Sequence, residues 1–314
     1  KAAMIPGVVR GMFALHARYG GLQWEALLLP AERLARFGNP VSRAFARRLA
    51  AVPPRALTDP TLQRLFAPAG KMTKEGDILT QFELSATLAR IRLKGPGDFY
   101  TGDFAKILAQ NLGAAAGIDI PISTFRDYRP KWLKTDKIDI GKDELHLPGN
   151  SVGAGAAALW RRTGGGGQRQ ARASYDSAGF VSVDRYGGGA ACLVSTNGTL
   201  GGGRTIGPSG ILMAAPPRGD AFSGVPMLLI NRPLRDTRGA AVGAGGAGAA
   251  ARVTAAARKM FDDDVLPEKA FGLVEGAAGR AGLIHCPTGA RVNPDSCRFA
   301  ADPAGHGLAV GAAP

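Results

Sequence analysis

The sequence has few of the residues that build metal sites and disulfide scaffolds. Of its 314 residues, three are cysteine and four are histidine. The cysteines form no Cys-x-x-Cys pair and the histidines lie far apart, so we expect no metal and no cofactor. Cys286 and Cys297 flank a turn-rich stretch. They could close a loop in an oxidising compartment, or remain two buried free thiols.

Long apolar runs are also missing. No segment approaches the roughly 18 uninterrupted apolar residues of a membrane-spanning helix. Hydrophobic residues make up 45% of the chain and charged residues 20%, which argues against wholesale disorder. A soluble globular protein without a membrane span is therefore predicted. No signal peptide is visible at Lys1, which fits a mature or truncated start as well as a cytoplasmic protein, because a removed signal leaves no trace.

Acidic residues are too few to balance the basic ones. The 39 Lys and Arg against 25 Asp and Glu leave a formal charge of +14, which could steer acidic partners toward the chain. The basic residues are scattered in twos, as in Arg47–Arg48 and Arg161–Arg162, with no recognition-helix pattern. We expect no nucleic-acid partner, and a solvated basic surface that could still bind an acidic protein.

Apolar residues recur at helical spacing through the first half of the chain. The periodicity predicts helices over residues 8–20, 24–38, 81–94 and 104–112. Gly20, Gly38 and Gly95 each follow the last apolar position of a predicted helix, where glycine commonly ends one. The first half is predicted to be mainly helical.

The pattern changes after Trp160. Residues 161–174 contain four consecutive glycines and no apolar periodicity, which indicates an exposed flexible connector. Residues 180–183 and 190–194 are predicted to be strands of a hairpin. Further short strands are predicted at residues 211–213 and 227–230, and a helix at residues 249–261. Helices, then hairpins, then a helix indicate a mixed fold with sheet and helices in layers.

Two long segments carry a series of motifs in a specific order. The first is PGVVRGMFALHARYGGLQWEALLLPAERLARFGNPVS, with a proline-glycine start, a Tyr-Gly helix end and a Pro-Ala-x-x-Leu-Ala helix. The second is GDILTQFELSATLARIRLKGPGDFYTGDFAKILAQ, with Gly-Asp, a leucine-rich helix and Gly-x-x-x-Phe-Tyr-x-Gly. Together they resemble the large subunit of gamma-glutamyltransferases. The resemblance implies an α+β fold, the αββα sandwich of N-terminal-nucleophile hydrolases. Residues 1–176 would be large-subunit-like and residues 177–314 small-subunit-like, intertwined in one domain.

The resemblance also places a nucleophile. In the family, a threonine starts a strand directly after a self-cleavage site and precedes a Phe/Tyr-Ser-Val-Val-Asp segment. Counting back from residues 180–184 puts this position at Ser177 and the cleavage between Asp176 and Ser177. Serine keeps the hydroxyl, and a freed α-amine with a reference pKa of about 7.7–8.0 can accept its proton. The glycines of 164–167, just upstream, would let the new chain end move away.

Further site residues are implied by the same resemblance. Asn197 matches an active-site asparagine, and Ser195 matches a hydroxyl near the nucleophile that helps bind substrate. Gly245–Gly246 matches the glycine pair whose N–H groups form the oxyanion hole. The plainer interpretation of these residues is that they form turns and a glycine-alanine loop.

Several family positions are replaced. The serine pair that helps hold the γ-glutamyl carboxylate falls on Leu229 and Ile230. The acidic residue that meets the substrate amine aligns near Arg218, with Asp220 a weak substitute two positions on. The family arginine that grips the α-carboxylate has no counterpart. We therefore expect altered glutamyl recognition, with a less polar acyl group fitting Leu229 and Ile230 better.

Two functions follow from these observations. The first is an amidohydrolase or acyltransferase that acts on γ-glutamyl, glutathione-like or related amides, splits into a large and a small fragment, and works in the periplasm or outside the cell. The second is a degenerate, non-catalytic family member that serves as a structural or interaction subunit of a larger assembly. A chain that splits at Ser177 favours the enzyme, and an intact chain favours the subunit.

Overall fold

The computed structural model describes residues 3–53, 57–161, 177–216, 224–246, 248–274 and 280–311. The chain forms two compact units. We call Lys1–Lys131 with Thr196–Pro216 the helical unit, and Trp132–Ser195 with Pro217–Pro314 the sheet unit. The division between units does not follow the predicted fragment boundary at Ser177. That the two fragments form one intertwined domain stays a prediction.

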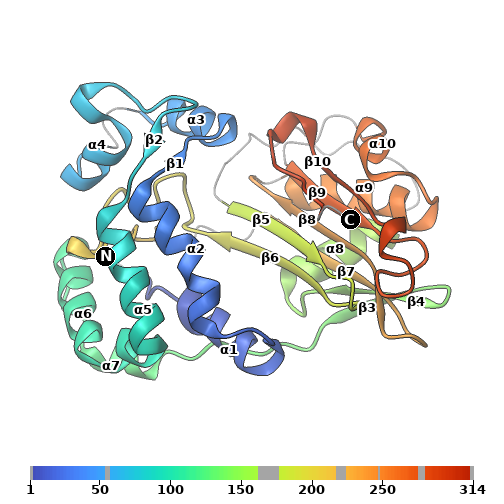
Figure 1. The fold of residues 1–314 in the computed structure, drawn as a ribbon, viewed down its shortest axis with the longest axis horizontal. Coiled ribbons are helices and arrows are strands. Elements are labelled where there is room, and N and C mark those ends of the chain that lie inside the picture. The colour runs from blue at the N-terminus through green and yellow to red at the C-terminus, as the bar shows by residue number, and fades with distance from the viewer. Residues whose placement is uncertain are drawn as a thin grey trace. The chain divides into compact units, whose positions relative to one another are not determined.

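The helical unit contains most of the helices expected from periodicity (Figure 1). Its helices are α1 (Val8–Tyr19), α2 (Trp24–Phe37), α3 (Arg43–Ala50), α4 (Pro60–Phe66), α5 (Phe82–Tyr100), α6 (Asp103–Ala116) and α7 (Ile122–Asp127). Short 3₁₀ turns lie at Pro68–Gly70 and Gly207–Ser209, and two short strands, β1 (Asn39–Pro40) and β2 (Ile78–Leu79), pair with each other. Gly95 has φ +70° within α5, so the regular helix is interrupted where the sequence predicted its end.

Two hydrophobic clusters hold the helical unit together. The larger contains Phe99, Tyr100 and Phe125, all at most 1% exposed. Tyr100 also donates its hydroxyl to the Pro6 carbonyl at 2.5 Å, and burial raises its pKa to about 12. The smaller cluster surrounds Leu49. Burying such side chains stabilises a fold by roughly 1.5–3 kcal/mol each, so these clusters fix the packing of the helices.

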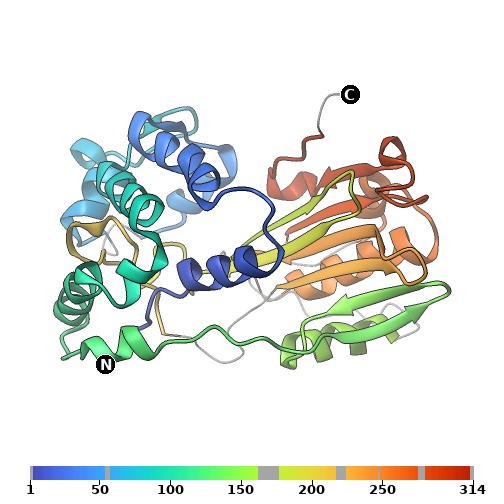
Figure 2. The same ribbon diagram turned by 60° about the horizontal axis from the view of Figure 1, so that its bottom comes forward.

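The sheet unit is built on six antiparallel strands in the order β10-β9-β8-β7-β4-β3. The strands are β3 (Asp136–Ile140), β4 (Asp143–Leu147), β7 (Val225–Asn231), β8 (Asp236–Ala244), β9 (Arg280–His285) and β10 (Arg298–Ala301). The β3–β4 hairpin, green in Figure 2, lies at one edge of the sheet. The unit also contains a separate hairpin, β5 (Ser177–Val183) with β6 (Gly189–Ser195), the helices α8 (Ser151–Arg161), α9 (Ala249–Asp262) and α10 (Pro267–Gly272), and 3₁₀ turns at Pro294–Ser296 and Pro303–Gly305.

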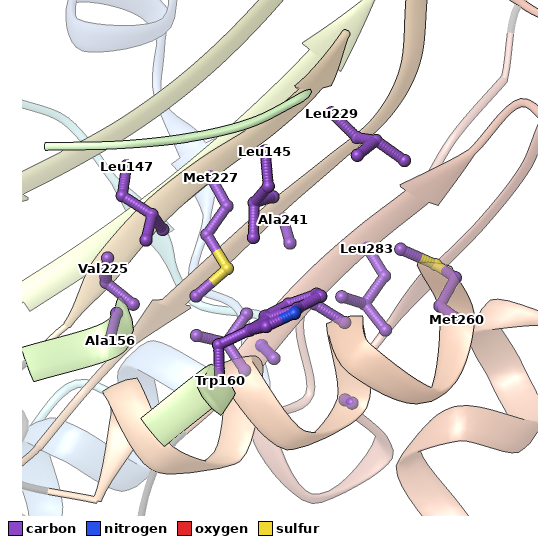
Figure 3. Close-up of a cluster of buried hydrophobic side chains, with 14 of the residues drawn as sticks. Leu145, Leu147, Ala156, Trp160, Val225, Met227, Leu229, Ala241, Met260 and Leu283 are labelled. Carbon is purple, nitrogen blue, oxygen red and sulfur yellow. The ribbon is translucent and has the colours of Figure 1, made fainter. Parts of the chain in front are cut away.

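Helices cover one face of this sheet, and the β5–β6 hairpin covers the other. Figure 3 shows Trp160 of α8 and Met260 of α9 in the same buried cluster as Met227 and Leu229 of β7. On the opposite face, a Cβ added to Gly179 of β5 would lie 2.5 Å from a methyl of Val242 in β8, a separation that real side chains do not adopt. Only glycine allows the hairpin to approach this closely. The layers are therefore helix, sheet and hairpin.

Some local expectations need correction. Residues 211–213 form no strand; Leu212 makes only an isolated bridge to Thr205, because the chain turns sharply through the intervening 3₁₀ turn. The predicted connector after Arg161 lies outside the described residues. Cys286 and Cys297 are joined in a disulfide, whereas Cys192 is free and partly buried. Of the two alternatives for the cysteine pair, the structure contains the loop-closing bond.

Candidate active site

Ser177 is the first residue of β5. Its position in the antiparallel register is directly opposite Ser195, the last residue of β6. Although serine is usually exposed, Ser177 is only 4% exposed. Its Oγ accepts a hydrogen bond of 2.9 Å from the backbone N–H of Gly245. Strand pairing and burial therefore bring the predicted nucleophile, a second hydroxyl residue and one predicted oxyanion donor into the same region of the sheet unit.

The backbone after β8 takes a conformation that favours glycine. Gly245 has φ +88° and Gly246 has φ +147°, both in the region that residues with a Cβ rarely adopt. These angles turn the chain from the end of β8 toward α9, directly after the N–H that Ser177 accepts. Glycine is therefore favoured at both positions by the backbone conformation. Their role as oxyanion donors, against a glycine-alanine loop without a function, stays a prediction.

Helix α9 begins directly beyond this turn. The Ala249 N–H donates to the Gly246 carbonyl at 3.0 Å, which ties the helix start to the glycine pair. The positive end of a helix dipole favours nearby negative charge. An N–H donor beside a hydroxyl oxygen also favours charge that develops on that oxygen. One of the two predicted oxyanion donors thus lies beside the predicted nucleophile, and its role in stabilising an oxyanion stays a prediction.

Asn197 belongs to the helical unit, unlike Ser177, Ser195 and Gly245. Its φ is +57°, a left-handed conformation that asparagine tolerates better than most residues. Its Nδ2 donates to the Ala215 carbonyl at 2.8 Å, so part of the amide stabilises its own loop. The predicted cleft that contains both Asn197 and Ser177 stays a prediction.

Two predicted site residues, Asp176 and Asp220, lie outside the described residues, as does Arg218. Leu229 does not have the expected role at an acyl pocket. It is 2% exposed and packs with Met227 in the core between sheet and helices (Figure 3), the face opposite the β5–β6 hairpin. Ile230 is partly buried and lies next to it on β7. Leu229 is therefore explained by core packing, and the expectation that it contacts an acyl group is wrong.

The described part of the chain contains no group of three or more His, Cys, Asp or Glu side chains placed to hold a metal ion. Within the same residues, each helix is too short or too polar to cross a bilayer.

Sequence reasoning missed one buried ionic contact near this site, between Arg252 of α9 and Asp302. Their side chains are 11% and 1% exposed. A signal was present, because an arginine in the first turn of a predicted helix is electrostatically unfavourable without a partner. No rule of sequence spacing connects it to an aspartate 50 residues away.

Comparison with a solved structure identifies the fold. The fold is similar to that of a cephalosporin acylase from Bacillus halodurans, with a TM-score of 0.71 over 96% of this chain and 76% of that chain, at 16% identity. The α+β fold is that of an N-terminal-nucleophile hydrolase. The sequence model of the family Gamma-glutamyltranspeptidase matches residues 1–161, about half of the chain. The chain belongs to the gamma-glutamyltranspeptidase family.

Individual relatives match over a somewhat shorter length of the chain. The chain is 38% identical over 128 residues to Scoloptoxin SSD14 from Scolopendra dehaani, which is 40% of this chain and 22% of that protein. It is 34% identical over 140 residues to a Glutathione hydrolase proenzyme from Pseudomonas aeruginosa, which is 44% of this chain and 24% of that protein. The chain thus matches less than a quarter of the length of either relative.

Proposed function

We propose that this protein is a self-processing amidohydrolase or acyltransferase whose nucleophile is Ser177. One observation carries the proposal: a buried serine at the start of a strand accepts the Gly245 N–H at 2.9 Å. A structural serine needs only some hydrogen-bond partner. Here the partner is a donor on a positive-φ glycine, next to a helix N-terminus, which is the kind of environment that stabilises developing negative charge.

Self-cleavage comes first in the proposed reaction. The Ser177 Oγ attacks the carbonyl carbon of Asp176 and loses its proton, and a C–O bond forms while the C–N bond to Ser177 breaks. The nitrogen leaves with a proton as a free α-amine. Water then hydrolyses the ester, which restores the Ser177 hydroxyl and leaves the Asp176 carboxylate. The products are a large and a small fragment that stay together as a heterodimer.

Substrate cleavage repeats this chemistry with another amide. The freed α-amine accepts the Oγ proton, Oγ forms an ester with the substrate acyl group, and the amine leaves. Gly245 and Gly246 donate to the oxyanion. Asn197 supports the nucleophile, while Ser195 and Asp220 contact the substrate. Water or an acceptor amine then releases the acyl group. No cofactor takes part in this scheme.

We assign γ-glutamyl, glutathione-like amides or related amides as the substrate class. A relative named Glutathione hydrolase proenzyme, matched over 140 residues, supports this assignment. Because Leu229 lies in the core, a preference for a less polar acyl group would have to come from other residues. The Cys286–Cys297 disulfide fits an oxidising compartment, which supports a periplasmic or secreted location.

The test is direct. Purified wild-type protein is incubated and its mass measured, and release of p-nitroaniline from γ-glutamyl-p-nitroanilide is followed. We expect fragments that begin at Lys1 and Ser177, with amidase activity appearing as the intact 32.4 kDa chain disappears. A chain that stays intact and inactive after long incubation would contradict the proposal.

A second function is favoured by one observation: a core leucine stands where the family has a substrate-binding serine. In this alternative, the protein is a non-catalytic subunit that uses its +14 charge to dock on an acidic protein partner. It predicts an intact chain, and a Ser177→Ala variant that binds the partner as tightly as wild type.

A further inference from the structure

A buried, two-pronged ion pair joins the start of α9 to the segment that follows β10. Arg252 Nε donates to Asp302 Oδ2 at 2.5 Å, and Nη2 donates to Oδ1 at 3.1 Å. The remaining Nη1 donates to the Val274 carbonyl at 2.8 Å. A planar guanidinium held at both edges in this way has a fixed position as well as a fixed charge. The first turn of α9 is thereby anchored.

This ion pair closes a ring of contacts around Gly245–Gly246. On one side, the Asp302 N–H donates to the Ala281 carbonyl at 2.8 Å, and Ala281 pairs with Gly243, two residues before Gly245. On the other side, the Ala249 N–H donates to the Gly246 carbonyl at 3.0 Å, and α9 continues from there to Arg252. Asp302 therefore connects to both chain segments that flank the glycine pair.

Stability alone is a weak reason for this arrangement. A cation in the first turn of a helix opposes the helix dipole. A buried ion pair often contributes no more stability than apolar side chains of the same volume would. The pair adds a polar constraint on the start of α9 to the apolar packing of this helix on β8, in which Val253 and Ala241 share one buried cluster.

We propose that Arg252 and Asp302 are positioning residues that hold the Gly245 N–H against the Ser177 Oγ. The inference rests on the proposed function of Ser177. Neither residue touches the reacting atoms in this proposal. Loss of the pair lets α9 shift relative to β8, which misaligns the donor and slows attack by Ser177 while the core of the sheet unit stays folded.

A matched control separates positioning from general stability. Asp236 is a fully buried carboxylate at the opposite end of the same strand β8, where it accepts the N–H groups of Arg291 at 3.0 Å and Val292 at 3.4 Å. Asp236→Asn should destabilise the sheet unit without moving Gly245. The test variants are Asp302→Asn and the double variant Arg252→Met with Asp302→Asn, which removes both charges.

Three measurements are made on each protein: the rate of cleavage at Asp176–Ser177 by mass spectrometry, hydrogen exchange of the Gly245 N–H, and thermal unfolding. We expect Asp302→Asn to slow cleavage roughly 10- to 100-fold and to speed Gly245 exchange, because small misplacements of a donor cost this much. Asp236→Asn should cleave like wild type. The double variant should recover stability, since no unpaired charge remains, yet it should stay slow.

The inference is overturned if Asp302→Asn cleaves as fast as Asp236→Asn with Gly245 exchange unchanged. It is also overturned if the double variant regains cleavage together with stability. If wild type does not cleave at all, the proposed function fails instead. Gly245 exchange in Asp302→Asn, compared with Asp236→Asn, then still decides whether the ion pair positions this N–H.

Discussion

Gly245 donates its backbone N–H to the Oγ of Ser177 at 2.9 Å, although the two residues are 68 positions apart in the sequence. The contact forms because β5 packs on β8 with the start of one strand near the end of the other. A side chain and a backbone donor from separate segments thus meet in a buried place.

The first prediction concerns the Ser177 hydroxyl. Ser177→Ala should remain a single chain and lack amidase activity, because one hydroxyl performs both the self-cleavage and the attack on substrate. Ser177→Thr restores the family nucleophile and should preserve cleavage or accelerate it. Mass spectrometry of the three proteins gives the answer. If wild type and Ser177→Thr both stay intact, catalysis is to be abandoned in favour of the subunit function.

Gly245→Ala should cost about 1–3 kcal/mol of stability, because alanine must adopt φ +88° there. It should also slow cleavage, since relief of this strain would turn the N–H away from Ser177. The matched control is Gly155→Ala in α8, where an added Cβ meets nothing within 4 Å. That change should stabilise the protein by about 0.5–1 kcal/mol. Urea unfolding measures both effects, and equal cleavage by the two variants would contradict the role of Gly245.

Restoring a family serine at position 229 should harm the protein. Leu229→Ser removes a core side chain and buries a hydroxyl, so the free energy of unfolding should fall by about 2–5 kcal/mol. The KM for a γ-glutamyl substrate should not improve. Ile230→Ser, at the more exposed neighbour, should cost less stability. A lower KM for Leu229→Ser would show that this residue does reach the substrate.

His285 should make stability depend on pH. Burial lowers its pKa below the ordinary 6.5, with Asp264 partly opposing the shift. The unfolded chain therefore binds a proton more readily, so stability should fall as pH drops through 6.5 toward the lowered value. Unfolding midpoints of wild type and His285→Gln across this window check it, because the variant should lose part of the slope. An unchanged slope would assign the pH dependence to other groups.

The Cys286–Cys297 disulfide should contribute about 2–3 kcal/mol, the range for a short closed loop. Cys297→Ser should lose this amount under oxidising conditions and nothing after reduction. Cys192→Ser serves as the control, since Cys192 is unbonded. Identical stability of wild type with and without a reducing agent would show that the bond does not support the fold.

Much of the local structure follows from the sequence. Apolar residues at helical spacing lie on one face of a helix whatever surrounds it, and this pattern is enough to locate α1, α2 and α9. The alternation and turn at residues 180–194 likewise locate the β5–β6 hairpin. The order of the family motifs also predicted that Ser177 begins a strand, and Ser177 is the first residue of β5.

The tertiary structure decided which of these elements meet. Successive residues of a strand point to opposite faces of the sheet, and the sequence of β7 alone does not show which face is covered by helices. In the structure, Leu229 points toward the helices and away from the hairpin. The packing of β5 on β8 brought Gly245 to Ser177, and the folding of the chain after β10 brought Asp302 to Arg252. Short-range periodicity reports only which face of an element is apolar. Contacts between distant residues depend on how those faces pack together. The free energy gained on packing depends on the apolar area that is buried, whatever the distance between the residues in the sequence.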